Sequence, residues 1–128
     1  MEKKQISLKM LGGRYAIGRL GANTAVPTWA DGTGFVSISR TEEELSIVCP
    51  EERMPQDVRC ERDWVCFQFL GPFAFDQTGI ALSVIRPLSE GEVGIFLVST
   101  FDTDYLLIKQ PLLERAKRLL LEAGHRLI

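Results

Sequence analysis

The chain has 128 residues and a mass of 14.4 kDa, which suits one domain or two small motifs of about sixty residues each. Its hydrophobic fraction of 45% lies well above that of disordered sequences, so most of the chain is expected to fold. A formal net charge of -2 and a pI near 5.4 provide no basic field for phosphates or anionic lipids, so we expect no nucleic-acid partner.

The longest apolar stretches, over residues 80–85 and 93–98, fall far short of the roughly 20 residues that a membrane span needs. The charged start of the chain is not followed by the apolar region of a signal peptide. We therefore expect a cytoplasmic protein without a membrane partner.

Three cysteines, Cys49, Cys60 and Cys66, and the single histidine, His125, lack the spacing of thiolate zinc sites. Cys66 lies in an apolar run, where cysteine packs as a small hydrophobic residue. We expect reduced, inert thiols, no metal and no cofactor, and His125 as an exposed residue at a helix cap or strand end.

The sequence pattern of the first half predicts a loose β-α-β-β order, in which the last two strands form a hairpin. A second helix is replaced by a stretch rich in proline and charge. The expected elements are a strand or bulged pair over 6–20, a short helix near 24–30, and strands over 35–40 and 45–49.

The second half predicts the order β-α-β-β-α-β. Its first strand is apolar on both faces, as a central strand should be, and each helix carries an apolar stripe at helical spacing. The expected elements are a strand over 64–70, a helix over 76–91, strands over 93–100 and 105–109, a helix over 111–124 and a last strand over 126–128.

The ends of both helices carry recognisable signals. Asp76 or Thr78 is the expected N-cap of the first helix, and Gly91 is its expected end. Pro87 lies in the last turn, where it removes a backbone donor and is expected to end or kink the helix. Gly124 is expected to end the second helix.

The two halves share the order β-α-β-β, which indicates an internal repeat of about sixty residues. A cluster of prolines and charges near residues 50–63 favours irregular backbone and separates them. We expect an α+β protein with one unit over residues 1–61 and a second over residues 62–128.

Two carboxylates, Asp102 and Asp104, flank the turn of the second hairpin. This spacing is typical of turn capping, and it would also allow acid/base chemistry or cation binding. The helix start at Gly79 should lie close to this turn, because both occupy strand ends of one small sheet. Backbone donors at one end and carboxylates at the other would suit a zwitterion.

Three segments of the second half carry a family resemblance. They are Gly71 to Ile80, Ser83 to Leu88, and Ser99 to Ile108, which reads STFDTDYLLI. Together they resemble the ACT domain of the CASTOR type, and the first half, with Leu45 to Glu52, resembles a divergent partner unit. The resemblance implies two ferredoxin-like βαββαβ units packed into one compact body, the first degenerate, with no catalytic activity. It also implies an amino-acid ligand bound between neighbouring units.

The resemblance implies site residues from two places. The helix contribution matches Ser83 and Val84, and Asp104 corresponds to the aspartate that meets the cationic side chain of the ligand. Both places lie in the second unit, so the resemblance implies a homodimer. Gln77 is neutral where the arginine sensors have an acidic residue, so the resemblance implies amino-acid binding and leaves arginine open. The loop contribution matches Phe75, Asp76, Gln77, Gly79, Ile80, Thr100, Phe101 and Asp104.

Two other hypotheses remain open. The chain could be an interaction module that assembles with an unknown protein partner and carries a vestigial pocket. An enzyme that uses Asp102 and Asp104 is a third hypothesis, with little support because the sequence offers neither a tuned base nor a metal framework.

Overall fold

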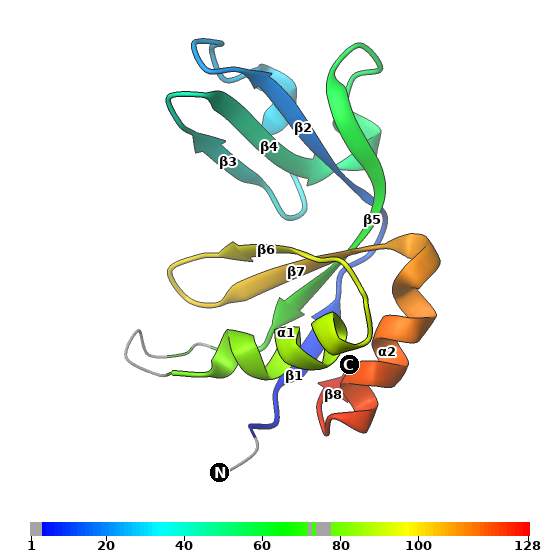
Figure 1. Cartoon of the computed structure of the whole chain (residues 1–128). Coiled ribbons are helices and arrows are strands. Elements are labelled where there is room, and N and C mark those ends of the chain that lie inside the picture. The colour runs from blue at the N-terminus through cyan, green and yellow to red at the C-terminus, as the bar shows by residue number, and fades with distance from the viewer. Residues whose placement is uncertain (1–3, 72, 74–77) are drawn as a thin grey trace. The chain divides into compact units, whose positions relative to one another are not determined.

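The computed structural model describes residues 4–71, 73 and 78–128 (Figure 1). Contacts divide the chain into two units. The inserted unit is Gly13–Trp64, and the split unit combines Val65–Ile128 with the described residues up to Gly12. These units differ from the predicted units over residues 1–61 and 62–128, because the first strand of the chain belongs with the C-terminal unit.

The inserted unit, described throughout, is an antiparallel sheet in the order β3-β4-β2-β5. The hairpin of β3 and β4 confirms the sequence prediction, whereas the short helix expected near 24–30 is a single 3-10 turn. The core gathers Ala16, Ala30, Leu45, Ile47, Cys49 and Met54. The elements are β2 (Tyr15–Gly21), η1 (Thr28–Ala30), β3 (Ser37–Arg40), β4 (Glu44–Pro50), η2 (Glu51–Arg53) and the first part of β5 (Arg59–Phe69).

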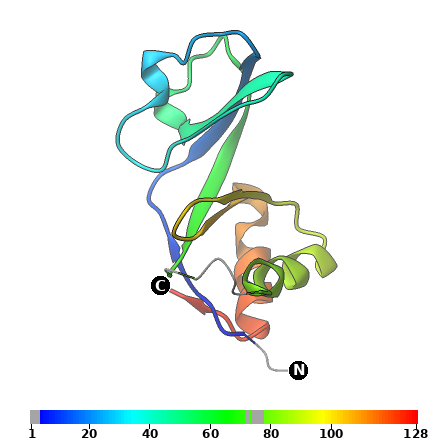
Figure 2. The same ribbon diagram turned by 90° about the vertical axis from the view of Figure 1, so that its left-hand side faces the viewer.

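The split unit has the predicted order β-α-β-β-α-β, preceded by strand β1. Its strands follow the order β8-β1-β5-β7-β6, and both α-helices lie on one face of this sheet (Figure 2). Neither of these helices is long and apolar enough to span a membrane. The elements are β1 (Ser7–Met10), the end of β5, α1 (Ile80–Glu90), β6 (Phe96–Ser99), β7 (Asp104–Lys109), η3 (Gln110–Leu112), α2 (Leu113–Glu122) and β8 (Arg126–Leu127).

Strand β1 lies between β8 and β5. Leu8 is fully buried and is paired with Phe69 on one side and with Leu127 on the other. Burial of this side chain in the core of the split unit stabilises the unit by about 1.5–3 kcal/mol, which favours the packing of β1 with the C-terminal residues.

The helix ends agree with the sequence predictions except at the start of α1. Gly79 precedes the helix in the left-handed region, with φ of 78°, and among the described residues no side chain caps the helix. The prediction of Thr78 as N-cap is therefore wrong, and Asp76 lies outside the described residues. Gly91 ends α1 as predicted, and the helix continues through Pro87 as far as Glu90, so the prediction of a helix end at Pro87 is wrong. Gly124, with φ of 93°, ends α2 as predicted.

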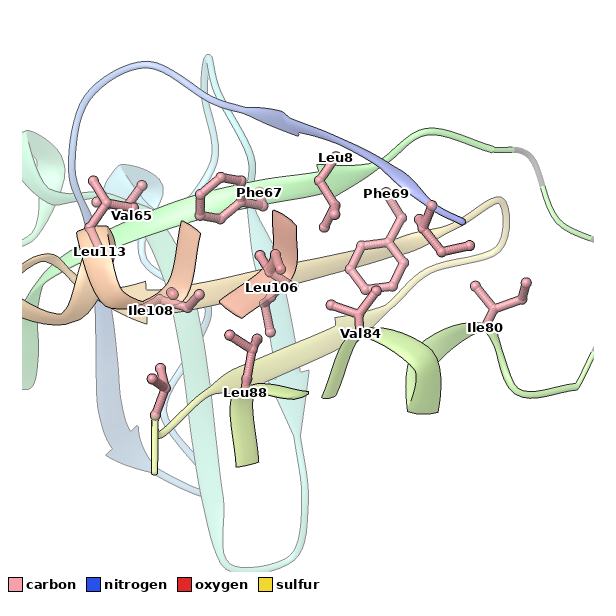
Figure 3. Packing of buried hydrophobic residues seen from close by; sticks show 14 residues of the cluster. Leu8, Val65, Phe67, Phe69, Ile80, Val84, Leu88, Leu106, Ile108 and Leu113 are labelled. Atoms are coloured by element: carbon pink, nitrogen blue, oxygen red, sulfur yellow. The ribbon is translucent and has the colours of Figure 1, made fainter. Parts of the chain in front are cut away.

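The core of the split unit lies between the sheet and the two helices (Figure 3). Phe67, Phe69 and Leu8 face it from the sheet, and Val84 and Leu88 face it from α1. These side chains are each at most 1% exposed. Their close packing fixes α1 against the sheet and therefore sets where the helix begins.

Alkaline pH is expected to destabilise the protein through Cys66. Burial raises the pKa of this thiol from 9.0 to about 12. Above pH 9 the unfolded chain releases the proton while the folded chain keeps it, so stability falls by up to about 1.4 kcal/mol per pH unit. Urea unfolding at pH 8 and pH 10 measures this loss. The variant Cys66→Ala should lose less stability over the same interval, and an equal loss in both proteins would contradict the assignment.

Candidate functional site

A pocket of about 400 Å³ opens between the start of α1 and the loop that joins β6 to β7. This volume lies within the range of small-molecule sites, roughly 300–1,000 Å³. The proximity of helix start and hairpin turn, expected from the sequence, is therefore confirmed. The lining residues, all in the split unit, are Phe73, Gly79, Ile80, Ala81, Leu82, Ser99, Thr100, Phe101, Asp102, Thr103 and Asp104.

The helix wall of the pocket begins at Gly79. Its carbonyl accepts the first hydrogen bond of α1, from the Ser83 N–H at 3.0 Å. Since no side chain of the described residues caps this end, the N–H groups of the first turn and the partial positive charge of the helix terminus are left for a ligand. An anionic ligand group would be stabilised there.

Replacing Gly79 with alanine is expected to lower the free energy of unfolding by about 1–2 kcal/mol, because φ of 78° is unfavourable for a residue with a Cβ. Gly94 is the matched control: its φ is not positive, and a Cβ there meets nothing within 4 Å. Thermal or urea unfolding of both variants provides the comparison. Equal effects of Gly79→Ala and Gly94→Ala would contradict the strained helix start.

The loop wall is held by a network of hydrogen bonds. The backbone N–H and the hydroxyl of Thr100 both donate to the Thr103 carbonyl, each at 2.8 Å. The buried hydroxyl of Thr103 donates to the Phe69 carbonyl at 2.7 Å, and the Phe73 N–H donates to the Asp102 carbonyl at 3.1 Å. The loop is thereby tied to the end of β5.

The variant Thr103→Val is expected to destabilise the protein by about 1–3 kcal/mol, because it leaves the buried Phe69 carbonyl without its hydroxyl donor. Thr103→Ser keeps the hydroxyl and should lose less stability than the valine variant. Urea unfolding measures both. If valine were tolerated as well as serine, the hydroxyl would not be what holds the loop.

Charges of both signs gather around the pocket. Asp104 is half-buried at the start of β7, where it is paired with Ser99, and Asp102 is exposed in the loop. Lys4 approaches the other wall: its Cε lies 3.2 Å from the position that a Cβ on Gly79 would occupy. Lys4 was not among the predicted site residues, because nothing in the sequence relates residue 4 to residue 79.

The structure places the predicted site residues in three groups. Those that line the pocket are Gly79, Ile80, Thr100, Phe101 and Asp104. Those that lie outside the described residues are Phe75, Asp76 and Gln77. Ser83 and Val84 form the third group and do not line this pocket.

The third group follows the first turn of α1. The hydroxyl of Ser83 donates to the Ile80 carbonyl at 2.7 Å, and its oxygen retains lone pairs for a further donor. Val84 is fully buried in the core, so its side chain is not available to a ligand at the surface of the split unit.

His125 is not the exposed residue that the sequence suggested. Only 4% of its surface is exposed, and both ring nitrogens have backbone partners. The Ile6 N–H donates to Nδ1 at 3.1 Å, and Nε2 lies 2.7 Å from the Ser83 carbonyl oxygen. The sequence-based prediction was wrong because these partners lie 119 and 42 residues away along the chain.

Candidate metal ligands are not gathered in the part of the chain that the structure describes, where no group of three or more His, Cys, Asp or Glu side chains could hold an ion.

A family model for the ACT domain matches residues 59–122, which is half of the chain. The chain belongs to the ACT-domain family. A second family model, for an N-terminal domain, matches residues 13–57, within the inserted unit. The ACT match contains α1, the hairpin loop and therefore the pocket.

Individual relatives of this ACT-domain protein agree with the assignment. The crystal structure of protein Atu0741 from Agobacterium tumefaciens is 59% identical, with a TM-score of 0.94 over 98% of this chain and 93% of that chain. The cytosolic arginine sensor for mTORC1 subunit 1 of Bos taurus is 30% identical over an alignment of 87 residues, and the match covers 59% of this chain and 26% of the sensor.

The fold recurs at much lower identity. The regulatory subunit of aspartate kinase from Thermus thermophilus has a TM-score of 0.60 at 9% identity, over 88% of this chain and 93% of that chain. Together with the element order of the split unit, this likeness confirms the α+β, ferredoxin-like fold.

Proposed function

We propose that this ACT-domain protein is a non-enzymatic regulatory protein of the cytoplasm that binds an amino acid in the pocket between α1 and the β6–β7 loop. The observation that carries the proposal is the pocket itself, where the start of α1 and a loop bearing Asp104 form two walls of one cavity. Support comes from the arginine-sensing function in the name of the Bos taurus relative.

The pocket suits a zwitterion with a cationic side chain. The start of α1 and the ammonium group of Lys4 would attract the ligand carboxylate, since both carry positive charge. Asp104 would accept hydrogen bonds from an ammonium or guanidinium group on the other side. The exposed ring of Phe101 would cover the aliphatic part of the ligand.

A second copy of the chain would complete the site. In this proposal α1 of the partner offers Ser83 to the ligand, whose hydroxyl oxygen can accept another hydrogen bond. Val84 would contribute through its backbone, because its side chain belongs to the core. The result is a homodimer with two symmetric pockets, each shared by two chains.

A thermal-shift screen against the common amino acids tests the proposed function, with calorimetry on each hit. A ligand present at 100 times its Kd should stabilise the folded chain by about 2.7 kcal/mol. We expect the largest shift from arginine, lysine or another cationic amino acid. If no amino acid at millimolar concentration stabilised a verified dimer, the proposed function would be rejected.

The apolar rim of the pocket favours a second candidate, a protein interaction module with a vestigial pocket. Phe101 is 78% exposed and Leu82 is 52% exposed, and both line the pocket. Exposed apolar side chains of this size are typical of protein interfaces. Pull-down of a partner with and without amino acids separates the two candidates: a partner that binds regardless of every ligand favours the module.

A further inference from the structure

The route of α1 through Pro87 leaves a hydrogen-bond acceptor without its helical donor. In a regular helix the N–H of residue 87 would donate to the carbonyl of Ser83, four residues earlier. Proline has no N–H, so this bond cannot form within the helix. A carbonyl that is shielded from water and has no donor destabilises the fold, so another donor is expected.

His125 supplies that donor from outside the helix. Its Nε2 lies 2.7 Å from the Ser83 oxygen, and its Nδ1 lies 3.1 Å from the backbone nitrogen of Ile6. The carbonyl can only accept and the amide can only donate, so the ring is neutral with its proton on Nε2. Both hydrogen bonds are made by one tautomer.

The backbone around His125 is also fixed. Gly124 takes the left-handed conformation that ends α2, and the His125 N–H donates to the Leu120 carbonyl at 3.0 Å. This is the closing hydrogen bond of a Schellman motif. The ring therefore joins three elements, because it links the residue before β1, the first turn of α1 and the end of α2.

We propose that His125 is a positioning residue for the pocket: by replacing the donor that Pro87 lacks, it holds α1 against β1 and sets the place of the helix wall. Ser83 lies one turn after Gly79, and its hydroxyl bonds the carbonyl of Ile80, which lines the pocket. The role in ligand binding rests on the proposed function, whereas the role in placing α1 does not.

A double-mutant cycle tests the hydrogen bond directly. His125→Phe removes both bonds at similar volume and should lower Tm by roughly 10 °C. Pro87→Ala restores the N–H that donates to the Ser83 carbonyl in a regular helix. In the His125→Phe background this carbonyl has lost its ring donor, so the change in Tm caused by Pro87→Ala should be about 3–6 °C more positive there than in the wild type. If Pro87→Ala changed Tm equally in both backgrounds, the proposal would be overturned.

Two NMR measurements distinguish a role of His125 in placing α1 from a general effect on the stability of the fold. The wild-type ring should show one protonated and one unprotonated nitrogen, with the proton on Nε2. His125→Phe should shift the amide signals of residues 80–82, and Pro87→Ala should reverse part of that shift. Leu113→Ala, a core variant at the other end of α2, should lower Tm without either effect. A proton on Nδ1, or unmoved helix-start signals in His125→Phe, would count against the proposal.

Ligand affinity provides the last comparison, with the amino acid found by the thermal-shift screen as the probe. His125→Phe should weaken binding about five-fold, and the double variant should recover part of the loss, while Leu113→Ala binds as the wild type does. An unchanged Kd in His125→Phe would refute the role in binding. If the wild type bound no amino acid, the proposed function would fail, and the cycle and the amide shifts would still decide the role of His125.

Discussion

Replacing Phe69 with alanine is expected to lower the free energy of unfolding by about 3–5 kcal/mol, the usual cost of removing a large aromatic side chain from a core. The Phe69 side chain is fully buried, and its backbone is paired with Leu8 of β1. Its carbonyl also accepts the hydroxyl of Thr103. The substitution therefore removes core packing next to the anchor of the pocket loop.

Phe101→Ala is the matched control, because the same side chain is 78% exposed there. Its stability should stay within about 0.5 kcal/mol of the wild type. Urea unfolding measures both variants, with the loss in Phe69→Ala seen as a lower midpoint. Losses of equal size would contradict the assignment of Phe69 to the core and of Phe101 to the surface.

The variant Asp104→Asn is expected to weaken binding of a cationic amino acid by about 10-fold to 100-fold, because a hydrogen bond to a charged group contributes about 1.5–3 kcal/mol. The substitution keeps the shape of the side chain and removes its charge. Isothermal titration calorimetry of the wild type and the variant measures the change in Kd.

Asp102→Asn is the control for general electrostatics. Asp102 lines the same pocket but is exposed, whereas Asp104 is half-buried, so water screens the charge of Asp102 more strongly. Its neutralisation should weaken binding by a smaller factor. If Asp104→Asn left the affinity unchanged, the pocket would not be the binding site, even if an amino acid still bound elsewhere.

The elements of the split unit follow from local sequence, with one exception. Periodicity and end signals predicted the second part of β5, α2 and the hairpin of β6 and β7, because these features depend on neighbours in the chain, whereas Arg59 to Asp63 were expected to be irregular and belong to β5. Strand β1 could not be assigned to its unit in this way. It has four residues, and the partners of Leu8 are Phe69 and Leu127, which no local pattern identifies.

The position of the pocket could be predicted from the sequence, but the contacts that hold its helix wall in place could not. Gly79 and the loop of Asp104 were expected to meet, because both follow from the order of strands in one sheet. His125 is buried, and its Nε2 lies 2.7 Å from the Ser83 carbonyl oxygen, to which Pro87 has no N–H to donate. The sequence shows that Pro87 removes a donor, but only the structure shows which residue replaces it.

An NMR titration with the amino acid that gives the largest thermal shift tests the central claim most directly. Amide signals are followed in the wild type and in Asp104→Asn as ligand is added. Binding in the pocket predicts that the largest changes occur at residues 79–82 and 99–104, and that they need a much higher ligand concentration in the variant. Changes confined to Gly13–Trp64, or identical titrations of the two proteins, would contradict an amino-acid site between α1 and the β6–β7 loop.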